Sequence, residues 1–341
     1  MERGKYISKK EAAALQGIAV CLMVFHHLFG FPERIHVPYV LNLNIFNFEI
    51  ILSYFGKFCI AIFAFVSGYG LQKKYNSMAE TSIVSGYKMV LKQLLHFFVK
   101  YWIVFVVFVP LGMLIGVYTF DWMHFIKGFI GWSDFYNAEW WYVSYYVRFV
   151  LLFPLVYFVL SWVSKKIPWR GIACITIVMM VVLAIVPASN FWEYFLCFFA
   201  GMVCVEISLF ERVTSGIPKW CVYILAVVLL GASSLIRVGI LGVGIPDYVL
   251  VIGFVFGVTT LLKTKLFGIV SAAFGFIGKY TTYIWLVHTF FAYYYFQSIT
   301  FIPRYSTLVF VWCMVLSIAT GMVLDLADRG IWKLTGKTKK A

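Results

Sequence analysis

The sequence has few charged residues. Asp, Glu, Lys and Arg make up 12% of its 341 residues, whereas 63% are hydrophobic and 20% are aromatic. A soluble globular domain typically contains about 25% charged and about 45–50% apolar residues. A soluble fold could not bury so much apolar surface, because even large domains leave much of theirs facing water. The scarcity of charge therefore excludes a soluble globular protein and indicates a chain that folds in a lipid bilayer.

The sequence also lacks the common motifs of metal, nucleotide and hydrolase sites. It contains no HExxH motif, no P-loop and no GxSxG element. Its seven cysteines are scattered without a CxxC pair, which is typical of small buried apolar residues rather than of a metal site or a disulfide framework. The adjacent His26 and His27 could not both ligate one metal from a single helix face. We therefore expect no bound metal.

Long apolar segments are what the sequence has instead. A transmembrane helix needs about 20 mostly apolar residues. Ten segments meet this requirement, namely 13–31, 50–71, 94–116, 141–161, 171–187, 191–208, 219–236, 247–263, 275–297 and 305–326. We predict an all-α integral membrane protein, a single polytopic domain over 1–341 with short basic tails at 1–12 and 327–341. The apolar stretch 123–131 is too short to cross and is expected to be interfacial or re-entrant.

The distribution of lysine and arginine predicts the orientation. The net charge of +14 would suit a nucleic-acid binder, but the basic residues lie in short stretches between the apolar segments. With ten spans and a cytoplasmic N-terminus, 21 of the 28 fall in cytoplasmic segments and only 4 in outer loops. This asymmetry is the positive-inside pattern, so both termini are predicted to be cytoplasmic. We expect the bilayer, and no nucleic acid, as a partner.

Among the ionisable side chains inside predicted spans, six are singled out. Such a residue costs about 2.5–3.5 kcal/mol on insertion scales, and each is therefore a candidate for function. The six are His26, His27, Lys57, Lys100, Arg148 and His288. His288 alone is ambiguous, because a histidine can also pack against a neighbouring helix.

The first predicted helix is the most informative. His27 follows Gln16 by eleven residues, which is about three turns and about 16 Å, so the two share a face while His26 is rotated by about 100°. A neutral imidazole at this depth can act as a general base on a hydroxyl. The alternative is a structural histidine bonded to a neighbouring helix. Helical phase favours His27 as the functional member and His26 as a packing or supporting residue.

Two further segments contain candidate substrate contacts. Trp141, Tyr145 and Arg148 recur at i, i+4 and i+7 on one helix face, where the arginine could hold an anionic group. Tryptophan here is also typical of a membrane-interface belt. Glu139 precedes this face near a predicted outer span end. Ser67 belongs to a small-residue step with glycines at 68 and 70, which chiefly favours close helix packing.

Together these segments resemble the membrane acyltransferase-3 family, the integral-membrane O-acyltransferases of bacterial surface glycans. Four segments in the right order, spread over nearly the whole chain, match its motifs. The first runs from Leu15 to Leu28 and matches a first-helix motif of a basic residue, ten residues and a histidine. The others are 63–69, similar to FFxxSGY; 137–145 followed by Pro154, similar to WYL…PL; and 280–288, similar to SxYxWLxH.

The resemblance implies a bacterial cytoplasmic-membrane enzyme with ten helices. It would move an acyl group, most simply acetyl, from cytoplasmic acetyl-CoA to a hydroxyl of a surface glycan or glycolipid. His27 would be the general base, with His26 and His288 as further catalytic candidates. The acceptor side would involve the predicted contacts Arg148, Trp141, Tyr145, Glu139 and Ser67. No cofactor would be bound permanently.

The sequence departs from the family pattern at one position. The family's basic residue, expected to meet the acyl-CoA donor, is Gln16 here, and glutamine cannot pair with a phosphate. Lys9, Lys10 or Lys100 could supply the missing cation. Two other functions stay open: a transporter or flippase of a lipid-linked sugar, which the absence of an internal repeat disfavours, and a catalytically inactive membrane partner, which Gln16 would explain.

Overall fold

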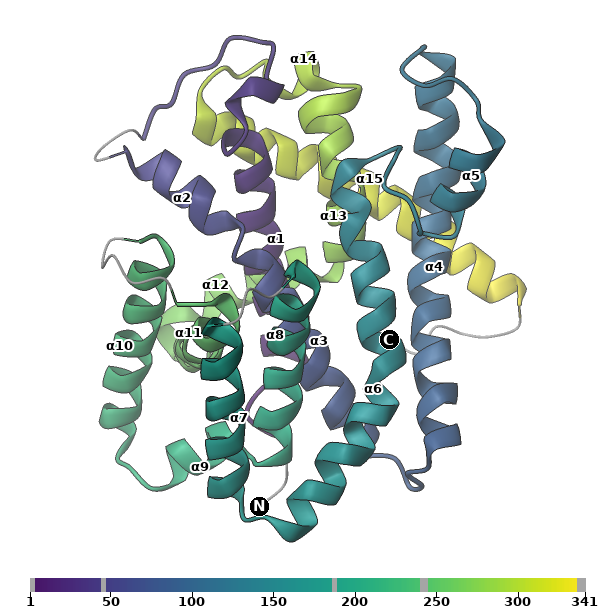
Figure 1. The fold of residues 1–341 in the computed structure, drawn as a ribbon. Coiled ribbons are helices and arrows are strands. Elements are labelled where there is room, and N and C mark those ends of the chain that lie inside the picture. The colour runs from purple at the N-terminus through teal and green to yellow at the C-terminus, as the bar shows by residue number, and fades with distance from the viewer. Residues whose placement is uncertain (1–3, 44–46, 186–188, 240–244, 336–341) are drawn as a thin grey trace. The chain divides into compact units, whose positions relative to one another are not determined.

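The structure is a computed structural model that describes residues 4–43, 47–185, 189–239 and 245–335. It is 81% helical, and the part it describes contains no strand (Figure 1). The elements are α1 (Lys9–Phe29), η1 (Pro32–Arg34), α2 (Phe48–Gly56), α3 (Cys59–Asn76), α4 (Ile83–Leu114), α5 (Trp122–Phe129), η3 (Ala138–Trp140), α6 (Trp141–Lys166), α7 (Trp169–Ile185), α8 (Asn190–Glu206), α9 (Leu209–Ser215), α10 (Lys219–Arg237), α11 (Asp247–Leu262), η4 (Lys265–Phe267), α12 (Gly268–Lys279), α13 (Thr281–Thr289), the π-helical η5 (Phe290–Tyr294), α14 (Gln297–Thr300) and α15 (Ser306–Leu334).

Several of these helices are long and apolar enough to cross a membrane. Six qualify in the described residues, and eight if each of two bent helix pairs forms one span. An all-α, multi-pass membrane fold is thus confirmed, while the count of ten spans and the cytoplasmic termini stay predictions. One predicted span, 275–297, is not a single helix. It is divided at Tyr280 and ends in the π-helical turn η5.

The chain divides into two compact units. The first contains residues 1–19, 57–91 and 148–278. Within it α3 and α8 pack so closely that a Cβ at Gly68 would overlap the main chain of Phe198, and one at Gly201 would overlap that of Phe65. The packing role predicted for the small-residue step is therefore confirmed at Gly68. Gly70 has open space around it and does not take part.

This close approach gives a matched pair of variants. Gly68→Ala is expected to lower the melting temperature of the purified protein in detergent, because overpacking a tight interface costs about 1–3 kcal/mol. Gly70→Ala is expected to leave it unchanged or raise it slightly, since alanine favours an exposed helical position by up to about 1 kcal/mol. Equal melting temperatures for the two variants would contradict the packing described here.

The second unit contains residues 20–56, 92–147 and 279–341. Its core is aromatic and lies between α4, the start of α6 and α13 with η5. The indole of Trp140 is 5.0 Å from the ring of Tyr101 and 5.8 Å from that of Phe290, and its Nε1 donates to the carbonyl of Leu286 at 3.1 Å. This packing fixes η3 against α13 and so determines where the neighbouring Glu139 lies.

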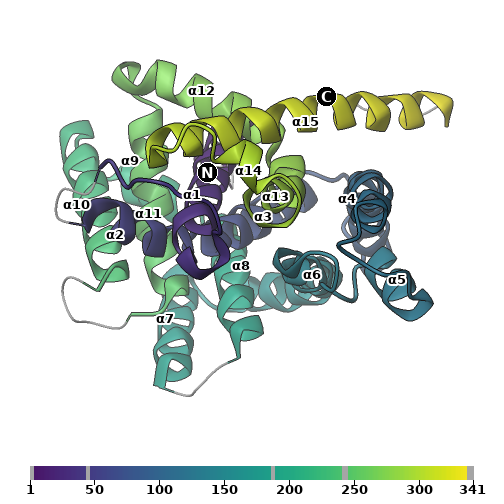
Figure 2. The same cartoon turned by 90° about the horizontal axis from the view of Figure 1, so that it is seen from above.

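The short apolar segment after α4 forms a helix, α5, which lies alongside α4 (Figures 1 and 2). Two hydrogen bonds hold it there, from the Tyr101 hydroxyl to the carbonyl of Gly128 at 2.6 Å and from the Trp102 indole to that of Phe129 at 2.9 Å. Asp121 caps its first turn by accepting from the main-chain N–H of His124 at 2.8 Å, and this bond lowers the pKa of the aspartate. α5 is too short to cross a membrane, as predicted.

Candidate active site

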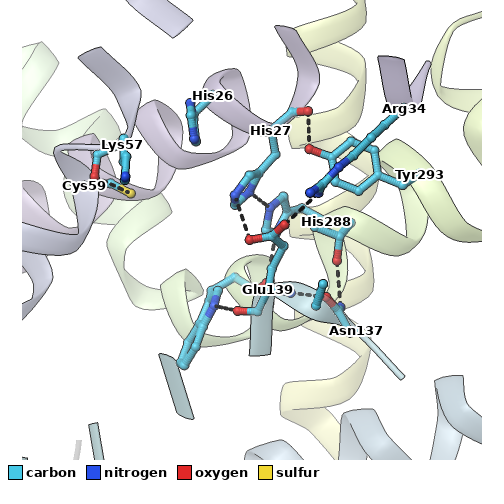
Figure 3. Close-up of polar contacts among 12 residues, drawn as sticks. His26, His27, Arg34, Lys57, Cys59, Asn137, Glu139, His288 and Tyr293 are labelled. Atoms are coloured by element: carbon cyan, nitrogen blue, oxygen red, sulfur yellow. Dashed lines mark hydrogen bonds and ion pairs between the residues drawn. The ribbon is translucent and has the colours of Figure 1, made fainter. Parts of the chain in front are cut away.

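Two histidines from distant parts of the sequence meet inside the second unit. His27, in the last turn of α1, lies with its Nδ1 2.7 Å from Nε2 of His288 on α13. The two rings are nearly parallel, with planes 18° apart and centroids separated by 4.9 Å. His288 is fully buried and His27 is 7% exposed. Both imidazoles have protein hydrogen-bond partners, as buried polar groups generally do (Figure 3).

The opposite nitrogen of His27 faces a carboxylate. Its Nε2 lies 3.2 Å from Oε2 of Glu139, and the other carboxylate oxygen of this residue accepts from the Arg34 guanidinium at 2.9 Å. The side chain of Glu139 is only 11% exposed, whereas that of Arg34 is 38% exposed. Glu139 therefore bridges a buried imidazole and a cation that solvent can reach.

Glu139 is held in place through its main chain. Asn137 caps η3 by accepting from the N–H of Glu139 at 3.0 Å, and its amide donates to the Thr289 hydroxyl at 2.7 Å. The Trp285 indole donates to the carbonyl of Glu139 at 3.3 Å. Since Trp285 and Thr289 flank His288 on α13, one helix orients both the carboxylate and the second histidine. Such supporting bonds keep a catalytic group in its productive geometry.

Tyr293 connects η5 to the same site. Its hydroxyl donates to the carbonyl of His27, and its ring lies 5.2 Å from the guanidinium carbon of Arg34. Tyr293 belongs to the π-helical turn η5, which ends the predicted span 275–297. π-helical turns occur often at functional sites.

The hydrogen bonds indicate where the cluster can hold protons. Nδ1 of His288 lies 2.9 and 2.8 Å from two main-chain carbonyls, which only accept, so this nitrogen carries a hydrogen. Its Nε2 can then accept from the Nδ1–H of His27. Two neutral imidazoles and a carboxylate carry these two protons, and a third can be taken up between His27 and Glu139. This third proton is the transferable one.

The other predicted catalytic residue, His26, lies apart from this hydrogen-bond chain. Its Nδ1 bonds to the carbonyl of Ser53 at 2.7 Å, and its ring packs on that of Phe31 with centroids 5.0 Å apart. The structure thus separates the two adjacent histidines as helical phase predicts. Trp141 and Tyr145 lie in the first turns of α6, which follow Glu139 in the sequence, and their ring centroids are 5.2 Å apart.

Three further predicted contact residues are described by their surroundings within their own unit. Arg148 belongs to the first unit, where its guanidinium lies 5.8 Å from the ring of Phe191. Lys100 lies 5.3 Å from the ring of Tyr283 in the second unit. Ser67 is half-buried in α3 and belongs to the first unit. Their predicted roles in substrate binding stay predictions.

The residues predicted to meet the donor lie toward the start of α1. Lys9 and Lys10 are exposed in its first turn, and Gln16 is half-buried two turns later. α1 is one unbroken helix, so Gln16 and His27 lie on one face about 16 Å apart, as predicted. The spacing does not test whether these residues bind the acyl-CoA donor, so that role stays a prediction.

Sequence reasoning missed three residues of the cluster. Arg34 counted only as an outer-loop charge, and Asn137 and Tyr293 were not singled out. Asn137 could have been found, because an asparagine just before Ala-Glu-Trp is a typical N-cap. No local pattern marks Arg34 or Tyr293. The structure places Glu139, which was predicted as a substrate contact, beside His27.

Within the described ranges no group of three or more His, Cys, Asp or Glu side chains is arranged to hold a metal ion. The polar atoms of the cluster bond to one another and to the main chain instead. The chemistry that the arrangement can perform is proton transfer by the imidazole–carboxylate pair.

The chain was compared with known protein families. The model of the acyltransferase-3 family, described as an acyltransferase domain, matches residues 11–326. No curated protein and no solved structure matches the chain significantly. The match covers every residue of the cluster around His27.

Proposed function

Because the chain belongs to the acyltransferase-3 family, we propose that it is a membrane O-acetyltransferase with His27 and Glu139 as its acid–base pair. The observation that carries this proposal is the hydrogen-bonded chain from His288 through His27 to Glu139. The donor would be acetyl-CoA from the cytoplasm of a bacterium. The acceptor would be a hydroxyl of a cell-surface glycan or glycolipid.

The reaction needs a group that takes one proton and returns it. When the acceptor hydroxyl attacks the thioester carbonyl, its proton passes to the His27–Glu139 pair, which then holds the three-proton state described above. As the tetrahedral intermediate collapses, the carbon–sulfur bond breaks and the same proton passes to the departing CoA thiolate. The products are an acetyl ester and free CoA, and the cluster returns to its starting state. His288 accepts the N–H of His27 and so holds the ring in one orientation.

The charge of the site also suits this chemistry. The tetrahedral intermediate develops a negative oxygen, and preorganised positive groups in a dry site stabilise such an oxygen. Arg34 is a cation held next to the pair, on the other oxygen of Glu139. The face of α1 that joins Gln16 to His27 would accommodate the extended donor.

Deletion of the gene tests this function in cells. The surface glycan of the deletion strain is expected to lose its O-acetyl groups, measured by mass spectrometry of the intact glycan. A plasmid copy of the wild-type gene should restore them, and a His27→Ala copy made in equal amount should not. Unchanged acetylation in the deletion strain, or full restoration by His27→Ala, would rule the proposal out.

A further inference from the structure

Arg34 is held rigidly at the edge of the site. Its guanidinium carbon lies 4.3 Å from the ring of Phe31 and 5.2 Å from that of Tyr293. Its main chain is fixed by the side-chain amide of Gln297, which donates to the carbonyl of Arg34 at 2.9 Å and accepts from the N–H of His36 at 2.8 Å. A cation positioned by so many contacts has little conformational entropy left to lose when a ligand binds.

The guanidinium has more donors than its partners use. It carries five N–H groups in a fixed fork, and one terminal nitrogen donates to Glu139. A second N–H is within hydrogen-bond reach of the hydroxyl of Tyr293, and Tyr294 is also close. Glu139 is the single carboxylate paired with Arg34 in the part of the chain that the structure describes. The side chain is 38% exposed, so a ligand can reach part of it.

Arg34 is the permanent cation of the cluster, because a guanidinium stays protonated in proteins. When the His27–Glu139 pair takes up a proton, the trio of His27, His288 and Glu139 becomes neutral, and the carboxylate no longer balances the charge of Arg34. An anion that binds to the exposed part of the guanidinium stabilises this charge.

We propose that Arg34 is an acceptor subsite that binds an anionic group, a carboxylate or a phosphate, on the glycan to be acetylated. This inference rests on the proposed function and specifies its substrate as an acidic sugar. The guanidinium fork matches both anions with two parallel N–H bonds. Because one carboxylate bonds both Arg34 and His27, an anion on Arg34 places a neighbouring hydroxyl of the same sugar within reach of the His27–Glu139 pair.

Direct binding tests the subsite without any chemistry. Methyl glucuronide, glucose 1-phosphate and the uncharged methyl glucoside are titrated against the full-length protein in lipid nanodiscs, with affinities from equilibrium dialysis. The wild type is expected to bind at least one anionic sugar about tenfold or more tightly than the glucoside, since hydrogen bonds to a charged group contribute about 1.5–3 kcal/mol. The tighter of the two anionic sugars identifies the group. Equal affinities for all three would overturn the proposal.

Variants assign the preference to Arg34. Arg34→Gln is expected to abolish the preference for the anionic sugar. Arg34→Lys should retain part of the preference, because the charge remains but the guanidinium fork is lost. Arg304 is an exposed arginine of the same unit, and Arg304→Gln should leave the preference intact. An undiminished preference in Arg34→Gln would contradict the subsite. If Arg34→Gln does not fold, an undiminished preference in Arg34→Lys has the same meaning.

The anion subsite and the acetyltransferase function can fail independently of each other. Anion binding through Arg34 without any release of CoA from acetyl-CoA would refute the acetyltransferase and leave the subsite standing. Acetyl transfer to neutral and acidic sugars with equal affinity would refute the subsite and leave the acetyltransferase standing.

Discussion

Replacing His27 by alanine is expected to lower the rate of acetyl transfer by about 10²–10⁴-fold, the contribution of a positioned acid–base group. The variant removes the side chain that bonds to both His288 and Glu139, so the acid–base pair is broken. The rate is measured on purified protein as the initial release of CoA that depends on added acceptor.

His26→Ala is the matched control. The two histidines are neighbours on α1, but His26 bonds to the main chain of Ser53 and lies outside the hydrogen-bond chain. We expect its variant to keep most of the rate. Equal losses in two variants that fold equally well would mean that the helix, and not the imidazole of His27, is what the reaction needs.

The second large effect is expected for Glu139→Gln, which should lower the rate by at least about 10²-fold. Glutamine has the size of glutamate and can still accept a hydrogen bond from Arg34, but it cannot share a proton with His27. The amide therefore leaves the geometry nearly intact and removes the acid–base partner. The same CoA-release assay measures the effect.

Glu33→Gln provides the comparison for this prediction. Glu33 is exposed in η1, next to Arg34 in sequence, and makes no contact with the cluster among those that the structure shows. Its variant should behave as the wild type. A Glu139→Gln protein as active as Glu33→Gln would show that the buried carboxylate has no part in the chemistry.

Much of the fold follows from the sequence because the bilayer imposes simple rules. Apolar segments of sufficient length become helices, since every main-chain polar group must be satisfied inside lipid. This holds for α1, α4, α6 and α15, each of which overlaps a predicted span. The rule failed at 275–297, where hydropathy continues across a break at Tyr280 that no apolar scale detects.

Sequence reasoning predicted only part of the site. The helical repeat separates His27 from His26, because phase is a local property of one helix. The pairing of His27 with Glu139 and with His288 joins residues more than one hundred positions apart, and nothing local specifies it. Arg34 escaped notice because a lone loop arginine has the same sequence signature whether it fixes topology or binds a ligand.

The most direct test of the central claim follows the acetyl group itself. Vesicles containing the purified protein are supplied with isotopically labelled acetyl-CoA and an acidic glycoside, and the glycoside is recovered and analysed by mass spectrometry. The account predicts labelled acetyl ester on the glycoside with the wild type and almost none with Glu139→Gln. Movement of unmodified glycoside into the vesicles, with no labelled ester formed, would contradict it and identify a transporter instead.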